Sequence, residues 1–293
     1  MQRKAKAILH AAAVFLIHIF TVSFSRVAWR MDTSLVVKEL AGNCLNLWSV
    51  FTAVYLYTKY VMKISLADVY CRKPLFLRRW CIVAVLLPAV VDMFYLFCVK
   101  GTLAFENPTL QDLLRIFVSN VLGQGIRAAV TEELLYRGLA FRALQTGFGK
   151  KGAAAASVFT YTLIQCMAMS FLNVKDALLT ILGTFLMGTA LTLVVCESGS
   201  IWSAVLIHAL YSIFAGDGQI LHIDTNQSFP AIWTYTLETD NWLLIGMPGM
   251  NTIYRALPSM LGFLLTGILA VCWMRKAGRT GAVTGKRGGP DGA

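Results

Sequence analysis

Residues 110–138 of this chain read LQDLLRIFVSNVLGQGIRAAVTEELLYRG, and their apolar residues recur at the three- and four-residue spacing of an α-helix. Pro108 and Thr109 stand directly before the stretch and supply a helix start. The run is long and apolar enough to predict a membrane span. Two adjacent carboxylates, Glu132 and Glu133, then fall near the inner end of this predicted span, at or below the lipid headgroups.

The composition of the whole chain agrees with a membrane span. Of the 293 residues, 57% are hydrophobic and only 14% are charged, and the mean hydropathy is +0.64. Soluble domains carry about a quarter charged residues, so this balance indicates a polytopic membrane protein. The seven cysteines are widely spaced and form no CxxC pair, which favours small buried side chains over a disulfide framework.

Apolar stretches long enough to cross a bilayer recur along the chain. We predict eight spans, at 7–26, 42–62, 80–99, 109–131, 152–172, 176–196, 200–217 and 256–274. The predicted fold class is therefore all-α, a polytopic membrane helix bundle of about eight transmembrane helices. We assign residues 1–276 to a single integral membrane domain and residues 277–293 to a disordered basic tail.

Most of the Lys and Arg residues fall on one side of these spans when the N-terminus is placed inside. This asymmetry predicts a multi-pass protein with both termini in the cytoplasm, which we assign to a bacterial plasma membrane. The net charge of +11 then places a basic inner face against anionic lipid headgroups, and nothing in the sequence indicates nucleic acid. The longest exterior connection, residues 218–255, is expected to form a partly ordered cap.

The two carboxylates have different neighbours on a helix. Glu133 and Arg137 are four residues apart and share a face, so we predict an interfacial ion pair that gives structural support to the site. Glu132 lies about 100° round the helix from Glu133 and is outside that pair. An unpaired carboxylate that faces the interior of a membrane bundle is a candidate functional group.

Other polar side chains interrupt the later spans. His208 and Ser212 are separated by four residues within the predicted span 200–217 and face the same way. Gln165 lies within the predicted span 152–172. Each of these side chains also fits a plainer interpretation, a hydrogen-bonded residue in the core of the bundle.

Taken in order, these motifs resemble the CPBP family of intramembrane proteases, which includes the type II CAAX prenyl endopeptidases and the Abi group of bacteriocin-processing or immunity proteins. EELLYRG resembles the family's EExxxRG motif, and ESGSIWSAVLIHALYS, residues 197–212, is similar to its tGsxxxxxxxHxxxN span. The resemblance covers residues 109–217. It implies that a glutamate and a first histidine activate water to cleave a peptide bond, while a second histidine and an asparagine stabilise the oxyanion.

The chain departs from this pattern at three positions. Tyr161 stands where the family's FxxxH motif has Phe, and Gln165 stands where it has the first histidine. Ser212 replaces the asparagine, while Glu132 and His208 match the family's glutamate and second histidine. The chain has no other histidine between His18 and His208 to take the vacant role.

The resemblance therefore assigns four catalytic candidates, which are Glu132, His208, Gln165 and Ser212. Gln165 can orient a water molecule but cannot accept a proton. One carboxylate and one histidine make a poor zinc site, since catalytic zinc normally takes three protein ligands. We therefore expect no metal ion and no other cofactor.

Three functions fit these observations. The first is a divergent CPBP endopeptidase that cleaves membrane-proximal peptide segments by glutamate-activated water, with a peptide or protein partner that carries a lipid, as in CAAX-type processing. The second is an inactive family member that serves as a membrane scaffold, immunity or binding protein. The third is a transporter in which Glu132 and His208 carry a proton.

Overall fold

The computed structural model describes residues 2–71, 76–167, 174–216, 219–224, 231–245 and 256–285. Its helices and strands, in chain order, are α1 (Gln2–Ser25), η1 (Arg26–Arg30), α2 (Leu35–Leu56), η2 (Tyr57–Met62), η3 (Leu66–Val69), α3 (Arg78–Cys98), β1 (Gly101–Phe105), α4 (Leu110–Ile116), η4 (Phe117–Arg127), α5 (Ala128–Glu132), η5 (Glu133–Ala140), α6 (Phe141–Met167), α7 (Val174–Ser198), α8 (Trp202–Tyr211), η6 (Ser212–Gly216), β2 (Leu221–Asp224), β3 (Trp233–Leu237), α9 (Trp242–Ile245) and α10 (Leu257–Gly285).

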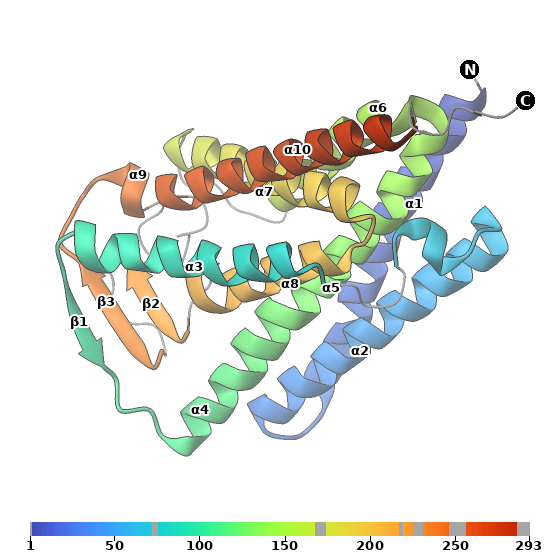
Figure 1. Ribbon diagram of the computed structural model, residues 1–293. Helices are drawn as coiled ribbons and strands as arrows, with labels where there is room; N and C mark the ends of the chain where they lie inside the picture. The colour runs from blue at the N-terminus through green and yellow to red at the C-terminus, as the bar shows by residue number, and fades with distance from the viewer. Residues whose placement is uncertain are drawn as a thin grey trace, which may run out of the picture.

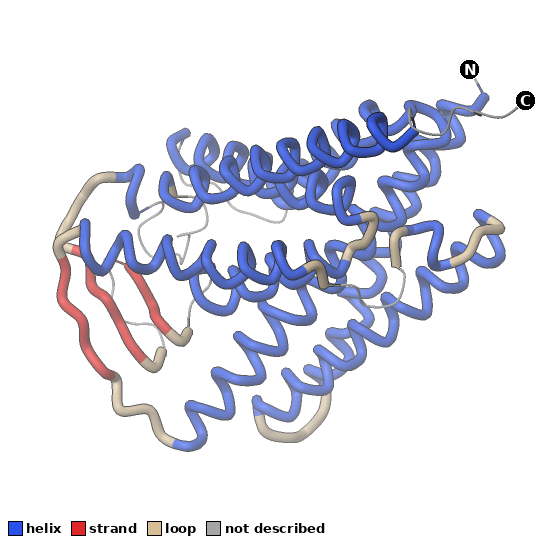
Figure 2. The backbone as a smooth tube through the Cα atoms, in the orientation of Figure 1, coloured by secondary structure: helices blue, strands red, loops and turns tan. Residues whose placement is uncertain are grey.

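The helices form one bundle in which two groups cross. The helices α3, α7, α8 and α10 run roughly side by side, while α1, α2 and the helix that starts at α4 cross them obliquely (Figure 1). The beginning of α1 and the end of α10 lie at one end of the bundle, and the strands lie at the other (Figures 1 and 2). The all-α membrane bundle predicted from the sequence is confirmed.

Each predicted span falls on helical structure wherever the residues are described. Among the described residues, five helical runs are long and apolar enough to cross a membrane, and these are Gln2–Arg30, Arg78–Cys98, Leu110–Cys166, Ala177–Ser198 and Leu257–Ala277. The third run contains two predicted spans, and Trp202–Ala215 is a shorter apolar helix. The predicted span 42–62 lies on α2 and η2, outside these five. The count of eight therefore stays a prediction.

The helix that carries the carboxylates is longer than predicted. A capping box opens it, because the Thr109 hydroxyl accepts from the Asp112 amide while the Asp112 carboxylate accepts from the Thr109 amide. The helix then continues through α4, η4, α5, η5 and into α6, where Gly149 (φ 67°) introduces a kink. The prediction that Glu132 and Glu133 lie at the helix end is therefore wrong, since both residues lie near the middle of this run.

A small sheet closes one end of the bundle. β3 pairs antiparallel with β1, which places Leu103 opposite Tyr235, and it pairs parallel with β2. β2, β3 and α9 all come from the connection 218–255, for which the sequence predicted only a partly ordered cap. The Tyr235 hydroxyl donates to the Val99 carbonyl at 2.7 Å, so the sheet is anchored to the end of α3.

We expect tags at either terminus to be accessible from the same side of sealed vesicles, because the beginning of α1 and the end of α10 lie together. Thiol-reagent access in oriented vesicles would measure this, and access to the two tags from opposite sides would contradict the arrangement. That this side is the cytoplasm stays a prediction. The disordered basic tail at 277–293 also stays a prediction. The structure describes α10 as far as Gly285.

Candidate active site

The predicted ion pair between Glu133 and Arg137 is present at the centre of the bundle. Arg137 Nη1 donates to Glu133 Oε1 at 3.0 Å, and both side chains are 0% exposed. The sequence predicted an interfacial pair, whereas the structure buries it completely. The long helix continues beyond these residues, so neighbouring helices cover them where headgroups and water were expected.

The Arg137 guanidinium lies against an aromatic ring. Its carbon Cζ is 4.0 Å from the centroid of the Tyr161 ring, a distance typical of a cation–π contact. Gly188 on α7 allows this approach, because an added Cβ would lie 3.1 Å from Tyr161 Cδ1 and 3.5 Å from Arg137 Nη2. Tyr161, at the position where the family has Phe, therefore holds the arginine by stacking.

Glu133 has a second partner that the sequence did not predict. His208 Nδ1 lies 3.0 Å from Glu133 Oε1, and the His208 side chain is 6% exposed. A carboxylate is an acceptor, so this contact assigns the proton of a neutral imidazole to Nδ1 and leaves Nε2 available. Glu133 therefore orients His208 as well as pairing with Arg137, and no spacing rule along the chain indicates this contact across helices.

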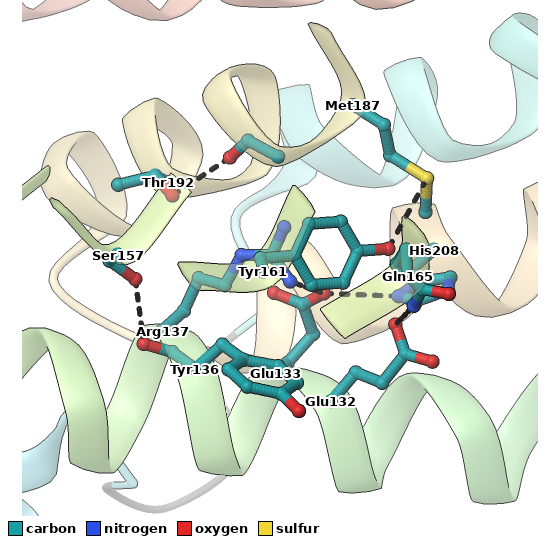
Figure 3. A network of polar contacts seen from close by, with 11 residues as sticks. Glu132, Glu133, Tyr136, Arg137, Ser157, Tyr161, Gln165, Met187, Thr192 and His208 are labelled. Atoms are coloured by element: carbon teal, nitrogen blue, oxygen red, sulfur yellow. Dashed lines mark hydrogen bonds and ion pairs between the residues drawn. The ribbon is translucent and has the colours of Figure 1, made fainter. Parts of the chain in front are cut away.

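Glu132 stands apart from that buried pair. Its carboxylate Oε2 accepts a hydrogen bond from Gln165 Nε2 at 3.0 Å, and both residues are partly exposed. Figure 3 shows Glu132, Glu133, Gln165 and His208 gathered in one place, with Gln165 beside His208. The structure thus brings together residues from α5, η5, α6 and α8 that are up to 76 positions apart in sequence.

Ser212 is the predicted site residue that the structure does not join to this group. It opens η6, one turn beyond His208. Within the described part of the chain, no hydrogen bond connects Ser212 with Glu132, Gln165 or His208. Ser212 thus shares a helix with the site without a direct polar contact to the other candidates.

Support for the site comes from buried hydrogen bonds between helices. Thr131, next to Glu132, donates from Oγ1 to Asn46 Oδ1 on α2 at 2.9 Å. Ser157 Oγ on α6 donates to the Tyr136 carbonyl at 2.9 Å. These contacts fix α5 and η5 against both neighbours, which limits the movement of Glu132.

Over the described ranges, no three His, Cys, Asp or Glu side chains form a group that could hold a metal ion. That the reaction needs no metal ion stays a prediction.

The residues that form this site lie within a segment that matches a known protein family. Residues 114–214 match a family described as type II CAAX prenyl endopeptidase Rce1-like. Over these residues the chain is similar to the CPBP family. The CPBP match includes the helices that carry Glu132, Gln165 and His208, and it excludes α1, α2, α3 and α10. No curated protein and no solved structure gives a significant match to the chain. The match and the long apolar helices indicate an integral membrane protein, and the similarity is to a class of proteases.

Proposed function

We propose that this protein is an intramembrane endopeptidase in which Glu132 activates the attacking water. The observation that carries the proposal is the difference between the two glutamates. Glu133 is fully buried and has Arg137 and His208 as partners, while Glu132 is partly exposed and accepts a hydrogen bond from the neutral amide of Gln165. A carboxylate with one oxygen left for water is suited to act as a general base.

In this mechanism Gln165 positions the base. Its Nε2 donor holds Oε2 of Glu132, which leaves Oε1 to bind a water molecule. Glu132 takes a proton from that water as the water oxygen attacks the peptide carbonyl carbon. Gln165 cannot exchange protons itself, so its contribution is to orient the carboxylate and the water.

In the same mechanism, His208 stabilises the negative charge that develops on the carbonyl oxygen of the substrate. Glu133 accepts from Nδ1, so a protonated His208 can direct its Nε2–H toward the oxyanion of the tetrahedral intermediate. The nearby carboxylate stabilises the imidazolium, as in other carboxylate–histidine pairs. Arg137 donates to Glu133 Oε1 and holds this carboxylate in place for this purpose.

The proposed substrate is a peptide segment at the membrane that is anchored by a lipid near its C-terminus. The family description supports this class, because it names a prenyl endopeptidase. The apolar outer surface of the bundle would keep such a lipid in the bilayer beside the protein. We further propose that both termini face the cytoplasm of a bacterium, where the basic ends of the spans meet anionic lipid headgroups.

Cleavage of a lipid-anchored peptide in ¹⁸O-labelled water tests whether the protein hydrolyses peptide bonds. Purified protein in liposomes is mixed with a peptide that carries a C-terminal lipid anchor, and the products are analysed by mass spectrometry. Hydrolysis by activated water places one ¹⁸O atom in the new carboxyl group. Binding of the peptide without any cleavage would instead support a scaffold, the alternative that Gln165 in the histidine position favours.

Gln165→His is expected to raise the cleavage rate, by about 10–100-fold. The imidazole restores a group beside Glu132 that can accept and release a proton near neutral pH. Gln165→Asn is the matched control, since it keeps the amide but shortens its reach. Initial rates in liposomes measure the change, and a rate unchanged or lowered by histidine would count against proton transfer at this position.

A further inference from the structure

His18 on α1 reaches the neighbourhood of the site from outside the family-matched segment. Its Nδ1 lies 2.7 Å from the hydroxyl of Tyr136 on η5. The two rings are 5.7 Å apart between centroids and are tilted by 32°. His18 therefore joins the long helix by a short hydrogen bond between two groups that can both exchange protons.

The position of α1 beside the long helix is fixed by close packing. A Cβ added at Gly147 would lie 2.8 Å from Ala7 Cβ and 3.1 Å from the Arg3 carbonyl, so the two backbones nearly touch there. Ala7 precedes His18 by eleven residues, and Gly147 follows Tyr136 by eleven. Equal spacing between two contacts is expected for antiparallel helices in register, so the packing of α1 places His18 beside Tyr136.

Tyr136 also connects His18 with the proposed base. Tyr136 follows Glu132 by four residues, so both side chains leave the same face of the helix. His18 interacts electrostatically with Glu132 on α5 and with Arg127 on η4. The groups that face His18 are thus the Tyr136 hydroxyl, the Glu132 carboxylate and the Arg127 guanidinium.

Hydrolysis of a peptide bond requires a proton donor for the leaving nitrogen as well as a base for water. Gln165 cannot supply that proton, although it occupies the position of the family's first histidine. We propose that His18, acting through Tyr136, is the proton-relay residue that takes over this role from another helix. This inference rests on the proposed function and adds a residue to it.

The proton balance of the relay is simple. Water gives one proton to Glu132 as its oxygen bonds to the carbonyl carbon. Glu132 passes this proton, by way of water, to the neutral His18 imidazole. When the carbon–nitrogen bond breaks, the Tyr136 hydroxyl gives a proton to the departing nitrogen and receives one from the His18 imidazolium so formed, and the site returns to its starting state with one water molecule consumed.

Four variants test the relay in the liposome assay. His18→Gln and Tyr136→Phe are each expected to lower the cleavage rate about 10²–10⁴-fold. Adding Gln165→His to His18→Gln should restore most of the lost activity, because an imidazole returns beside Glu132. His10→Gln is the control: His10 lies on the same helix and makes the same kind of bond, 2.7 Å from its Nδ1 to the Tyr57 hydroxyl, away from the site. Its rate should be unchanged.

The inference fails if the wild-type protein cleaves and Glu132→Gln does not, while His18→Gln retains full activity. It also fails if Gln165→His gives no rescue in a folded His18→Gln protein, since His18 would then have only a structural role. A protein that never cleaves overturns the proposed function instead. In that event, NMR of labelled histidines still decides the coupling: Glu132→Gln should shift the titration midpoint of His18 and leave that of His10 in place, and an unmoved His18 would overturn the relay.

Discussion

Glu132→Gln is expected to lower the rate of peptide cleavage by about 10²–10⁴-fold with little loss of stability. The amide has nearly the same shape as the carboxylate, and its carbonyl oxygen can still accept from Gln165 Nε2. It cannot take a proton from water, so the loss falls on the chemical step. The measurement is kcat for a lipid-anchored peptide in liposomes, together with the melting temperature of the purified variant.

The matched control for this variant is Asp92→Asn. Asp92 is a partly buried carboxylic acid on α3, and it lines a separate apolar pocket with Pro88 and Phe214. The substitution removes a membrane carboxyl group without touching Glu132, so kcat should stay near the wild-type value. Cleavage that survives Glu132→Gln would refute Glu132 as the base, whatever the control shows.

Arg137→Met should destabilise the protein by about 3–5 kcal/mol, because it leaves the Glu133 carboxylate buried without its counter-charge. Both side chains are fully buried, and the guanidinium is also stacked on Tyr161. Methionine approximates the aliphatic length of arginine, so the loss reports mainly on charge. Equilibrium unfolding in detergent micelles measures the free energy.

A second variant separates the charge from the packing. In the double variant Glu133→Gln with Arg137→Met no ionised group remains buried at this pair, so we expect it to be more stable than Arg137→Met alone. Lys100→Met is the surface control: Lys100 pairs with Glu238, and both side chains are well exposed. If the unfolding midpoint of Arg137→Met matches that of Lys100→Met, the buried pair contributes little to the free energy of unfolding.

Much of the fold follows from the hydrophobic pattern. Apolar runs such as 80–99 and 256–274 coincide with α3 and α10, because a bilayer requires helices of that length. The small sheet was not predicted. Its strands are short, and β1 pairs with β3 between residues 128–136 positions apart, so local sequence carries no signal of that register.

At the candidate site, some of the contacts between side chains could be predicted from the sequence and others could not. The four-residue spacing predicted the bond between Glu133 and Arg137, and the family motifs predicted that Glu132, Gln165 and His208 belong together. The contact of Glu133 with His208 could not be predicted, because it depends on how α8 crosses η5. His18 lies outside every motif, and only the packing of α1 reveals it.

The length of the central helix has a consequence for the lipid that surrounds the protein. Residues 110–148 include the π-helices η4 and η5, so the α-helical rise of 1.5 Å per residue sets an upper limit of about 58 Å on their length, well above the ~30 Å thickness of a hydrocarbon layer. The helix lies oblique to α3 and α10 (Figure 1), and tilting is one way in which a helix longer than the bilayer is accommodated. Glu132 lies near its middle, so the tilt of this single helix sets the depth of the carboxylate. A thicker bilayer that draws the helix upright would shift Glu132 along the membrane normal, and with it the position at which a peptide is cut.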